Sequence, residues 1–160
     1  MRILIVSDSH GRNVYLDQAI EKVGAIDLLI HLGDFEGSED YIEAIAPCKL
    51  EMVSGNNDYF SSIDREKIIT IGRYKVLLTH GHRHRVNYST DTIKSFGLQE
   101  SVDIVMFGHT HIPLIDLSGS VMLINPGSIS LPRQDGRIPT FILMELDNQG
   151  KAHFTLNYLK

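Results

Sequence analysis

The chain has 160 residues, a formal net charge of −5 at neutral pH and one cysteine. Its length is enough for a core of its own, and we expect one domain over residues 1–160. One cysteine excludes a disulfide within the chain and suits a reducing compartment. No apolar stretch approaches the roughly 20 residues that span a bilayer, and the apolar N-terminal run is too short for a signal peptide. We therefore expect a cytoplasmic protein without a membrane segment, in which the acidic balance disfavours long nucleic acid as a partner.

Predicted strands and helices alternate in the first half of the chain. The apolar spacing from Leu16 to Val23 predicts a helix with Asn13 as its N-cap and Gly24 as its C-cap. The other predicted elements of this half are strands at residues 2–7, 27–31 and 49–54 and a helix at residues 38–46. This βαβαβ order implies parallel strands joined by right-handed crossovers.

The second half begins with a hairpin signal. Residues 68–71 and 74–78 flank Gly72 and Arg73, which predicts antiparallel pairing. A helix over residues 90–99 and a strand over residues 103–107 come next. Four short strands separated by turns complete the chain, at residues 114–117, 121–124, 140–145 and 153–158. We expect an α/β domain with a mixed sheet and a second, mostly antiparallel sheet packed on it.

Side chains that can bind metal ions follow five of the apolar runs. The carboxyl ends of parallel strands gather at one edge of an open sheet, so these side chains are expected to converge. The candidate ligands are Asp8, His10, Asp34, Asn56, His80, His109 and His111. Such a set exceeds the four ligands of a structural zinc site and suits two cations that share one carboxylate. The sequence therefore predicts a dinuclear site, and Mn²⁺, Fe²⁺, Co²⁺, Ni²⁺ and Zn²⁺ all fit its ligands.

Each segment also has a purely structural interpretation. Asp8 and His10 would point the same way if their strand extended that far, but Asp-Ser-His-Gly is also an ordinary turn sequence. Asp34 could serve only a turn or a helix cap, and the sequence around Asn56 is typical of a turn. A lone histidine is more often structural, and we assign His31 such a role. Asp-x-His at one strand end and His-x-His at another together favour metal binding.

Together the five segments resemble the motifs of the calcineurin-like metallophosphoesterases. The matching residues are Asp8-x-His10, Gly33-Asp34, Gly55-Asn56-x-Asp58, His80 and Gly108-His109-x-His111. Asn125-Pro126-Gly127-Ser128 and the chain length are similar to the small YfcE-like phosphodiesterase branch of that family. Vps29, a non-catalytic retromer subunit, is more distantly similar. The resemblance implies a four-layer αββα sandwich of two mixed sheets, with a dinuclear site at the carboxyl ends of the strands.

The resemblance also implies which residues share each metal. One ion would be held by Asp8, His10 and His111, the other by Asn56, His80 and His109, and Asp34 would bridge the two. The implied cofactors are two divalent metal ions per chain, with Mn²⁺ expected first and Ni²⁺, Co²⁺, Fe²⁺ or Zn²⁺ as alternatives.

The implied activity is that of a phosphoric diester hydrolase, in which a metal-bridging hydroxide attacks a small phosphodiester. Asp34, Asn56 and Asn57 would be the catalytic residues, and Asn57 would contact the substrate. His82, two residues after His80, either contacts the substrate or supports a metal ligand. Many members of the family have a histidine where this chain has Asn57. An amide donates hydrogen bonds but is no general acid near neutral pH. We therefore expect modest activity, greatest for esters with stable leaving groups.

Two other functions fit the same residues. A non-catalytic scaffold like Vps29 would bind a protein partner, although the first metal motif, which is altered in Vps29, is intact here. A phosphomonoesterase is the other alternative, and Asn57 counts against efficient monoester hydrolysis. The sequence leaves open the natural substrate, the native metal, association into a homo-oligomer, and whether Arg83, Arg85 or Arg133 contact an anionic substrate.

Overall fold

The computed structural model describes residues 1–159, which form two five-stranded sheets and three α-helices in that part of the chain. The strands of the first sheet are β1 (Arg2–Val6), β2 (Leu28–His31), β3 (Lys49–Met52), β9 (Thr140–Leu146) and β10 (Ala152–Tyr158). Those of the second are β4 (Glu66–Ile71), β5 (Tyr74–Thr79), β6 (Ile104–Met106), β7 (Pro113–Asp116) and β8 (Met122–Pro126). The helices are α1 (Val14–Val23), α2 (Glu39–Ile45), α3 (Asp91–Gln99) and a 3₁₀ turn (His82–His84).

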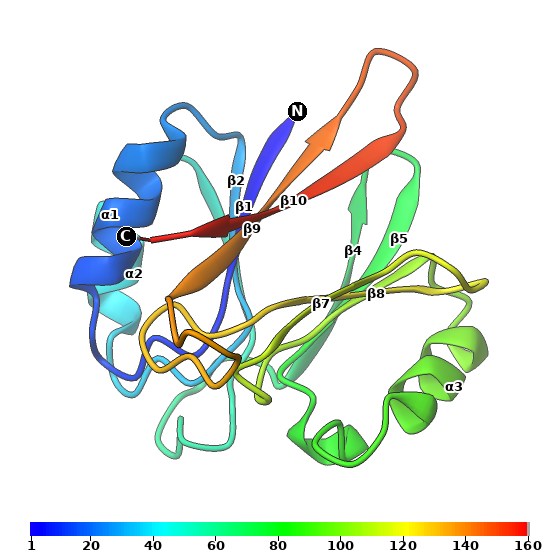
Figure 1. The fold of residues 1–160 in the computed structure, drawn as a ribbon, viewed down its shortest axis with the longest axis horizontal. Coiled ribbons are helices and arrows are strands. Elements are labelled where there is room, and N and C mark those ends of the chain that lie inside the picture. The colour runs from blue at the N-terminus through cyan, green and yellow to red at the C-terminus, as the bar shows by residue number, and fades with distance from the viewer. Residues whose placement is uncertain (160) are drawn as a thin grey trace.

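The two sheets face each other, and helices cover both outer faces (Figure 1). Alternate residues of β1 enter two cores, because successive side chains of a strand point to opposite faces. Ile3 and Ile5 pack between the sheets, whereas Leu4 and Val6 pack against α1 and α2. On the other side, α3 buries Ile93 against the outer face of the second sheet. This four-layer αββα arrangement confirms the expected fold class.

The first predicted helix lies where its apolar spacing places it. Leu16 is buried among the residues that pack on the first sheet. Gly24 takes a positive φ of 72°, and its N–H donates to the carbonyl of Ile20, as predicted for a C-cap. Asn13 stands at the N-cap position, but its side chain makes no capping hydrogen bond. Within residues 1–159, none of the helices is both long and apolar enough to cross a membrane.

The second sheet is mixed, so the expectation of a mostly antiparallel sheet was wrong. Its order is β4-β5-β6-β8-β7, in which β5, β6 and β8 run parallel and only the outer pairs are antiparallel. β9 and β10 join the first sheet beside β1 instead. Val105 faces α3 while its neighbours face the first sheet, so β6 is buried on both faces. Such strands are continuous apolar runs, which carry no signal of direction.

The parallel strands end at one edge of the molecule, the lower edge in Figure 1. Backbone hydrogen bonds join the loops there: Asp8 N donates to Gly33 O at 3.0 Å, and Gly108 N donates to His80 O at 3.1 Å. Gly33 has a φ of 97°, and a Cβ at this position would lie 2.7 Å from the backbone nitrogen of Gly55. The backbones of successive loops therefore approach too closely for a side chain at this point.

Candidate metal centre

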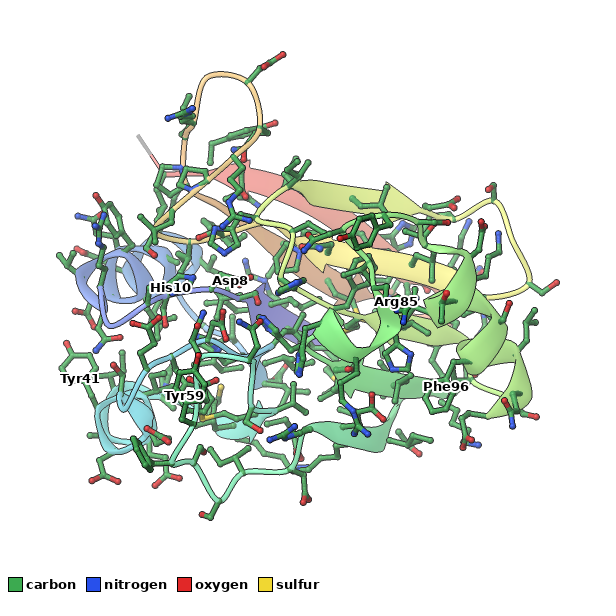
Figure 2. All side chains as sticks on the ribbon, turned by 90° about the horizontal axis from the view of Figure 1, so that it is seen from below. Asp8, His10, Tyr41, Tyr59, Arg85 and Phe96 are labelled. Carbon is green, nitrogen blue, oxygen red and sulfur yellow. The ribbon has the colours of Figure 1, made fainter. Side chains whose placement is uncertain are left out.

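Two overlapping groups of candidate ligands meet at this edge. One ligand atom from each of Asp8, His10 and His111 lies within 4.8 Å of the others, and the same holds for Asp8, Asp34 and His80. Asp8 belongs to both groups, because its Oδ1 lies 3.2 Å from His111 Nε2 and 3.8 Å from His80 Nε2. Figure 2 looks onto this edge and shows Asp8 and His10 together at it. The structure thus gathers residues from four of the five motifs around one carboxylate.

Asp34 belongs to the second group and also approaches His10 of the first. Its Oδ2 is 3.4 Å from His80 Nε2 and 3.9 Å from His10 Nε2. Asn57 donates to the same carboxylate twice, from its backbone N at 2.9 Å and from its side-chain amide at 2.7 Å. Burial opposes ionisation, but the neighbouring His80 ring and the two hydrogen bonds from Asn57 outweigh it and hold the pKa of Asp34 well below its usual range. Asp34 is therefore a carboxylate placed where it can reach a cation on either side.

His80 presents one ring nitrogen to the two carboxylates. Its Nδ1 donates to the carbonyl of Leu32 at 2.7 Å, which leaves Nε2 facing Asp8 and Asp34. Burial opposes a positive charge on this ring, yet the carboxylates of Asp34 and Asp8 raise the pKa of His80 to about 9. The space between these carboxylates therefore favours a positive charge, whether a proton or a metal cation.

His109 and His82 stand beside His80. The ring centroids of His80 and His109 are 5.1 Å apart, and the His82 ring lies 5.5 Å from His80 and 6.1 Å from His109. Burial lowers the pKa of both neighbours, that of His82 to about 4, so both are neutral imidazoles near neutral pH. His109 Nε2 lies 2.8 Å from the side-chain amide nitrogen of Asn87.

Several candidate ligand atoms are buried without a partner. Asp8 Oδ1, His80 Nε2 and the amide oxygen of Asn56 make no hydrogen bond within the described part of the chain. An unpaired buried polar group costs about 1–3 kcal/mol, and two of these atoms, Asp8 Oδ1 and His80 Nε2, lie 3.8 Å apart, which is unusual for a site that serves folding alone. Carboxylate, imidazole and amide atoms are the donors that divalent cations take. The residues present therefore fit bound metal.

The backbone at the candidate ligands is in a rare conformation. Positive φ values of 45–70° occur at Asp8 (56°), His10 (46°), Asp34 (56°), His109 (67°) and His111 (60°). The argument that an extended strand would aim Asp8 and His10 the same way was wrong, because β1 ends at Val6. A turn in the left-handed region brings these two side chains together instead. Such strained residues persist only where the surroundings hold them, and they cluster at functional sites.

Other side chains orient the candidate ligands. Glu36 Oε1 lies 2.7 Å from His10 Nδ1, and the carbonyl of Leu131 lies 2.7 Å from His111 Nδ1. Both contacts leave Nε2 free to bind metal, as the partners of metal-binding histidines commonly do. Ser128 Oγ donates to the carbonyl of Asp8 at 2.8 Å. The Asn-Pro-Gly-Ser motif signalled Ser128 in the sequence, whereas no sequence signal identified Glu36.

Asp58 joins the loops after β2 and β3. Its Oδ2 accepts the backbone N–H groups of Asp34 and Gly55, each at 2.7 Å. Its Oδ1 accepts those of Phe35 at 2.9 Å and Glu36 at 2.7 Å. Four donors converge on one buried carboxylate, which fixes the position of Asp34 relative to the Asn56 loop. The sequence motif included Asp58 but did not indicate this role.

The basic segment Arg83-His84-Arg85 lies toward α3. His84 Nε2 pairs with Glu66 at 2.6 Å, and its ring packs on Phe96 with centroids 4.8 Å apart. Figure 2 shows Arg85 on the same side of the molecule as Phe96, away from His10 in this view. Arg133 is tied to the site through its backbone, whose N–H donates to the carbonyl of His111 at 3.0 Å.

His31 is buried and structural, as its assigned role requires. The backbone N–H of Gly33 donates to its Nδ1 at 3.2 Å, so its Nε2 carries the proton and donates to Ser9 Oγ at 3.0 Å. Burial lowers the pKa of His31 to about 4. The neutral ring thereby links the loops that carry Asp8 and Asp34.

This burial predicts a pH dependence of stability. Between pH 6.5 and pH 4 the unfolded imidazole binds a proton that folded His31 rejects, so His31 lowers the free energy of unfolding as pH falls through this window. We expect His31→Asn, which keeps an acceptor for Gly33, to be about 1–2 kcal/mol less stable at pH 7.5. Below pH 6.5 the free energy of unfolding of the variant should fall less steeply than that of the wild type, and the two slopes should differ by about 1.4 kcal/mol per pH unit. Urea unfolding of the metal-free proteins measures both; parallel pH profiles would contradict the assignment.

Comparison with known proteins identifies chains that are similar to this one over most of their length. Residues 1–149 match the calcineurin-like phosphoesterase superfamily domain. The chain is 35% identical over 149 residues to a probable metallophosphoesterase, YsnB, of Bacillus subtilis, covering 92% of this chain and 86% of that one. A predicted phosphoesterase from Streptococcus pneumoniae superposes with a TM-score of 0.81 at 28% identity, covering 99% of this chain and 88% of that chain.

Two further solved structures share the fold at lower identity. Vps29 of Entamoeba histolytica, complexed with Zn²⁺, has a TM-score of 0.77 at 24% identity and covers 99% of each chain. An archaeal phosphodiesterase has a TM-score of 0.74 at 24% identity, covering 98% of this chain and 100% of that one. The same architecture therefore occurs both in an esterase and in a protein named for vacuolar sorting.

Proposed function

Because the chain belongs to the calcineurin-like phosphoesterase superfamily, we propose that it is a metal-dependent phosphodiesterase. The observation that carries this proposal is the pair of candidate ligand groups that share Asp8 and enclose unpaired ligand atoms. The names of the bacterial metallophosphoesterase and the archaeal phosphodiesterase described above support the same reaction class.

The chain offers ligands for two divalent cations, with Mn²⁺ the first candidate. Asp8, His10 and His111 would hold one, Asn56, His80 and His109 the other, and Asp34 would reach both. Zinc in the Vps29 structure shows only that the fold accommodates that ion in that protein. Bound divalent cations would lower the pKa of a bound water and neutralise charge on the phosphoryl oxygens.

The remaining roles belong to the protein's own side chains. Asn57 holds Asp34 in its ionised form and position through two hydrogen bonds. His82 lies beside two candidate ligands, and its neutral ring carries one N–H that can donate to a phosphoryl oxygen. Neither residue supplies a proton readily near neutral pH, because an amide does not titrate and burial lowers the pKa of His82 to about 4. The leaving group would therefore depart as an anion, which favours diesters of acidic alcohols.

A direct assay separates the diesterase from its two rivals. Protein stripped of metal and resupplied with Mn²⁺ is offered bis(p-nitrophenyl) phosphate and, separately, p-nitrophenyl phosphate. The proposal expects metal-dependent cleavage of the diester at a higher kcat/KM than that of the monoester. A preference for the monoester would make the protein a phosphomonoesterase. Metal binding without turnover of either ester would favour a scaffold that binds a protein partner.

The role of position 57 can be tested by restoring a proton donor. We expect Asn57→His to raise monoesterase activity relative to diesterase activity by about tenfold or more, because general acid catalysis contributes about 10²–10⁴-fold where the leaving group is poor. The ratio of kcat/KM for the two nitrophenyl esters measures the effect. Asn57→Gln is the matched control, since it keeps an amide, and metal content is measured in both variants. An unchanged ratio with intact metal content would argue against this role.

A further inference from the structure

A cavity of about 660 Å³ adjoins the candidate metal centre. Asn57 and Glu36 line it, and each also contacts a candidate ligand: Asn57 donates to Asp34, and Glu36 pairs with His10. The cavity is thus continuous with the residues that surround the reacting phosphate in the proposed function. Its volume lies within the range of about 300–1,000 Å³ that is typical of small-molecule sites.

Two aromatic side chains in this cavity wall are exposed to solvent. Tyr59 exposes 79% of its surface and Phe60 is fully exposed. Large apolar side chains contribute nothing to the core from such positions. Exposed aromatic rings beside a catalytic site are instead typical platforms on which planar groups of a ligand stack.

The segment that carries these rings is anchored at its base. Asp58, which immediately precedes Tyr59, is held by four backbone N–H groups, and Ser61 N donates back to the carbonyl of Asp58 at 3.3 Å. Figure 2 shows Tyr59 on the side of the molecule that carries His10. The two rings are therefore presented from a fixed turn beside the metal centre.

The charges in the cavity select among aromatic ligands. Glu36 and Glu39 supply carboxylates to its lining, and no Lys, Arg or His is among the described lining residues. One oxygen of Glu36 pairs with His10, and its other oxygen is available as an acceptor. Carboxylates attract hydroxyl, amide N–H and amino donors and repel a second phosphate. The cavity therefore suits a neutral, planar group that carries hydrogen-bond donors.

We infer that this cavity binds the nucleoside part of a phosphodiester substrate. The inference rests on the proposed function, because the phosphate would lie at the metal centre beyond Asn57. The base would stack on Phe60 and Tyr59, and the sugar hydroxyls and base N–H groups would donate to Glu36 and Glu39. The acidic lining disfavours longer oligonucleotides, whose next phosphate would enter the same cavity.

Binding measurements test this inference without requiring turnover. Adenosine 5′-monophosphate and methyl phosphate carry the same phosphate charge and differ in the nucleoside, so their Kd values for Mn²⁺-loaded protein are compared by calorimetry. We expect the nucleotide to bind at least about tenfold more tightly. Phe60→Ala should reduce nucleotide affinity by about tenfold, because removal of one base-stacking ring typically has an effect of this size. The affinity for methyl phosphate should stay unchanged. Phenyl phosphate, which has a ring but no donors, should fall between the two.

Tyr88→Ala is the matched control variant. Tyr88 is also an exposed aromatic residue, but it lines a different cavity, so its loss should leave all three affinities unchanged. Equal affinities for nucleotide and methyl phosphate, or equal losses for both in Phe60→Ala, would overturn the inference even if bis(p-nitrophenyl) phosphate is hydrolysed. Nucleotide selectivity that depends on Phe60 without turnover of any diester would support the nucleoside site and overturn the proposed reaction.

Discussion

Asp34→Asn is expected to abolish turnover and to reduce metal binding from two ions per chain to at most one. The substitution keeps the size of the side chain but removes the negative charge that lies 3.4 Å from His80 Nε2 and 3.9 Å from His10 Nε2. Changes to residues that only orient metal ligands cost about 10–100-fold in affinity or activity, so loss of a shared ligand should cost more than a hundredfold. Bis(p-nitrophenyl) phosphate hydrolysis and elemental analysis of dialysed protein measure the two effects.

Asp135→Asn is the control for the loss of one carboxylate. Asp135 is exposed, so the variant should keep both its metal content and its activity. Circular dichroism of both variants checks that they are folded. An Asp34→Asn protein that retains two metal ions and full activity would contradict the role proposed for Asp34 as a ligand shared by the two cations.

Asp58→Ala is expected to lower the free energy of unfolding by about 3 kcal/mol or more. It removes both carboxylate oxygens and leaves four backbone N–H groups without their acceptor, each of which costs about 1–3 kcal/mol when it stays buried and unpaired. Asp58→Asn keeps one acceptor oxygen and should lose roughly half as much. Urea unfolding of the metal-free proteins gives both values.

Asp58→Ala should also weaken metal binding, although Asp58 is not one of the candidate metal ligands. Without Asp58, the backbone of Asp34 loses its tie to Gly55, and the two candidate ligand loops can separate. Mn²⁺ affinity should decrease from the wild type to Asp58→Asn and then to Asp58→Ala. An Asp58→Ala protein with wild-type stability would show that water replaces the carboxylate, and the positioning role would be wrong.

The motifs predicted the fold and the meeting place of the candidate ligands well. Each of the five motifs follows a strand, and the parallel strands of each sheet share one carboxyl edge, so the motifs of one sheet converge by topology. The packing of the two sheets on each other brings the two sets of motifs together. The family resemblance drawn from these motifs is confirmed by the match over residues 1–149. The role of each ligand toward a particular metal stays a prediction.

What the sequence did not indicate depends on contacts between distant segments. The direction of β6 and β8 was missed, because strands buried on both faces show no periodicity that distinguishes parallel from antiparallel neighbours. The left-handed backbone at Asp8 was missed because it is imposed by neighbouring loops and not by local propensity. Tyr59 and Phe60 gave no signal, since only the structure shows that these rings are exposed beside the site.

The dependence of turnover on metal stoichiometry tests the central claim most directly. Metal-free protein is titrated with Mn²⁺ while hydrolysis of bis(p-nitrophenyl) phosphate is followed, with bound metal measured at each point. Two ligand groups that share Asp8, with Asp34 of one group 3.9 Å from His10 of the other, predict little activity at one equivalent and a plateau at two equivalents per chain. A plateau at one equivalent would contradict the dinuclear centre. The proposed phosphodiesterase activity would be contradicted if the protein binds two equivalents of metal but cleaves no diester. This result would have to hold for Mn²⁺ and also for Ni²⁺, Co²⁺, Fe²⁺ and Zn²⁺.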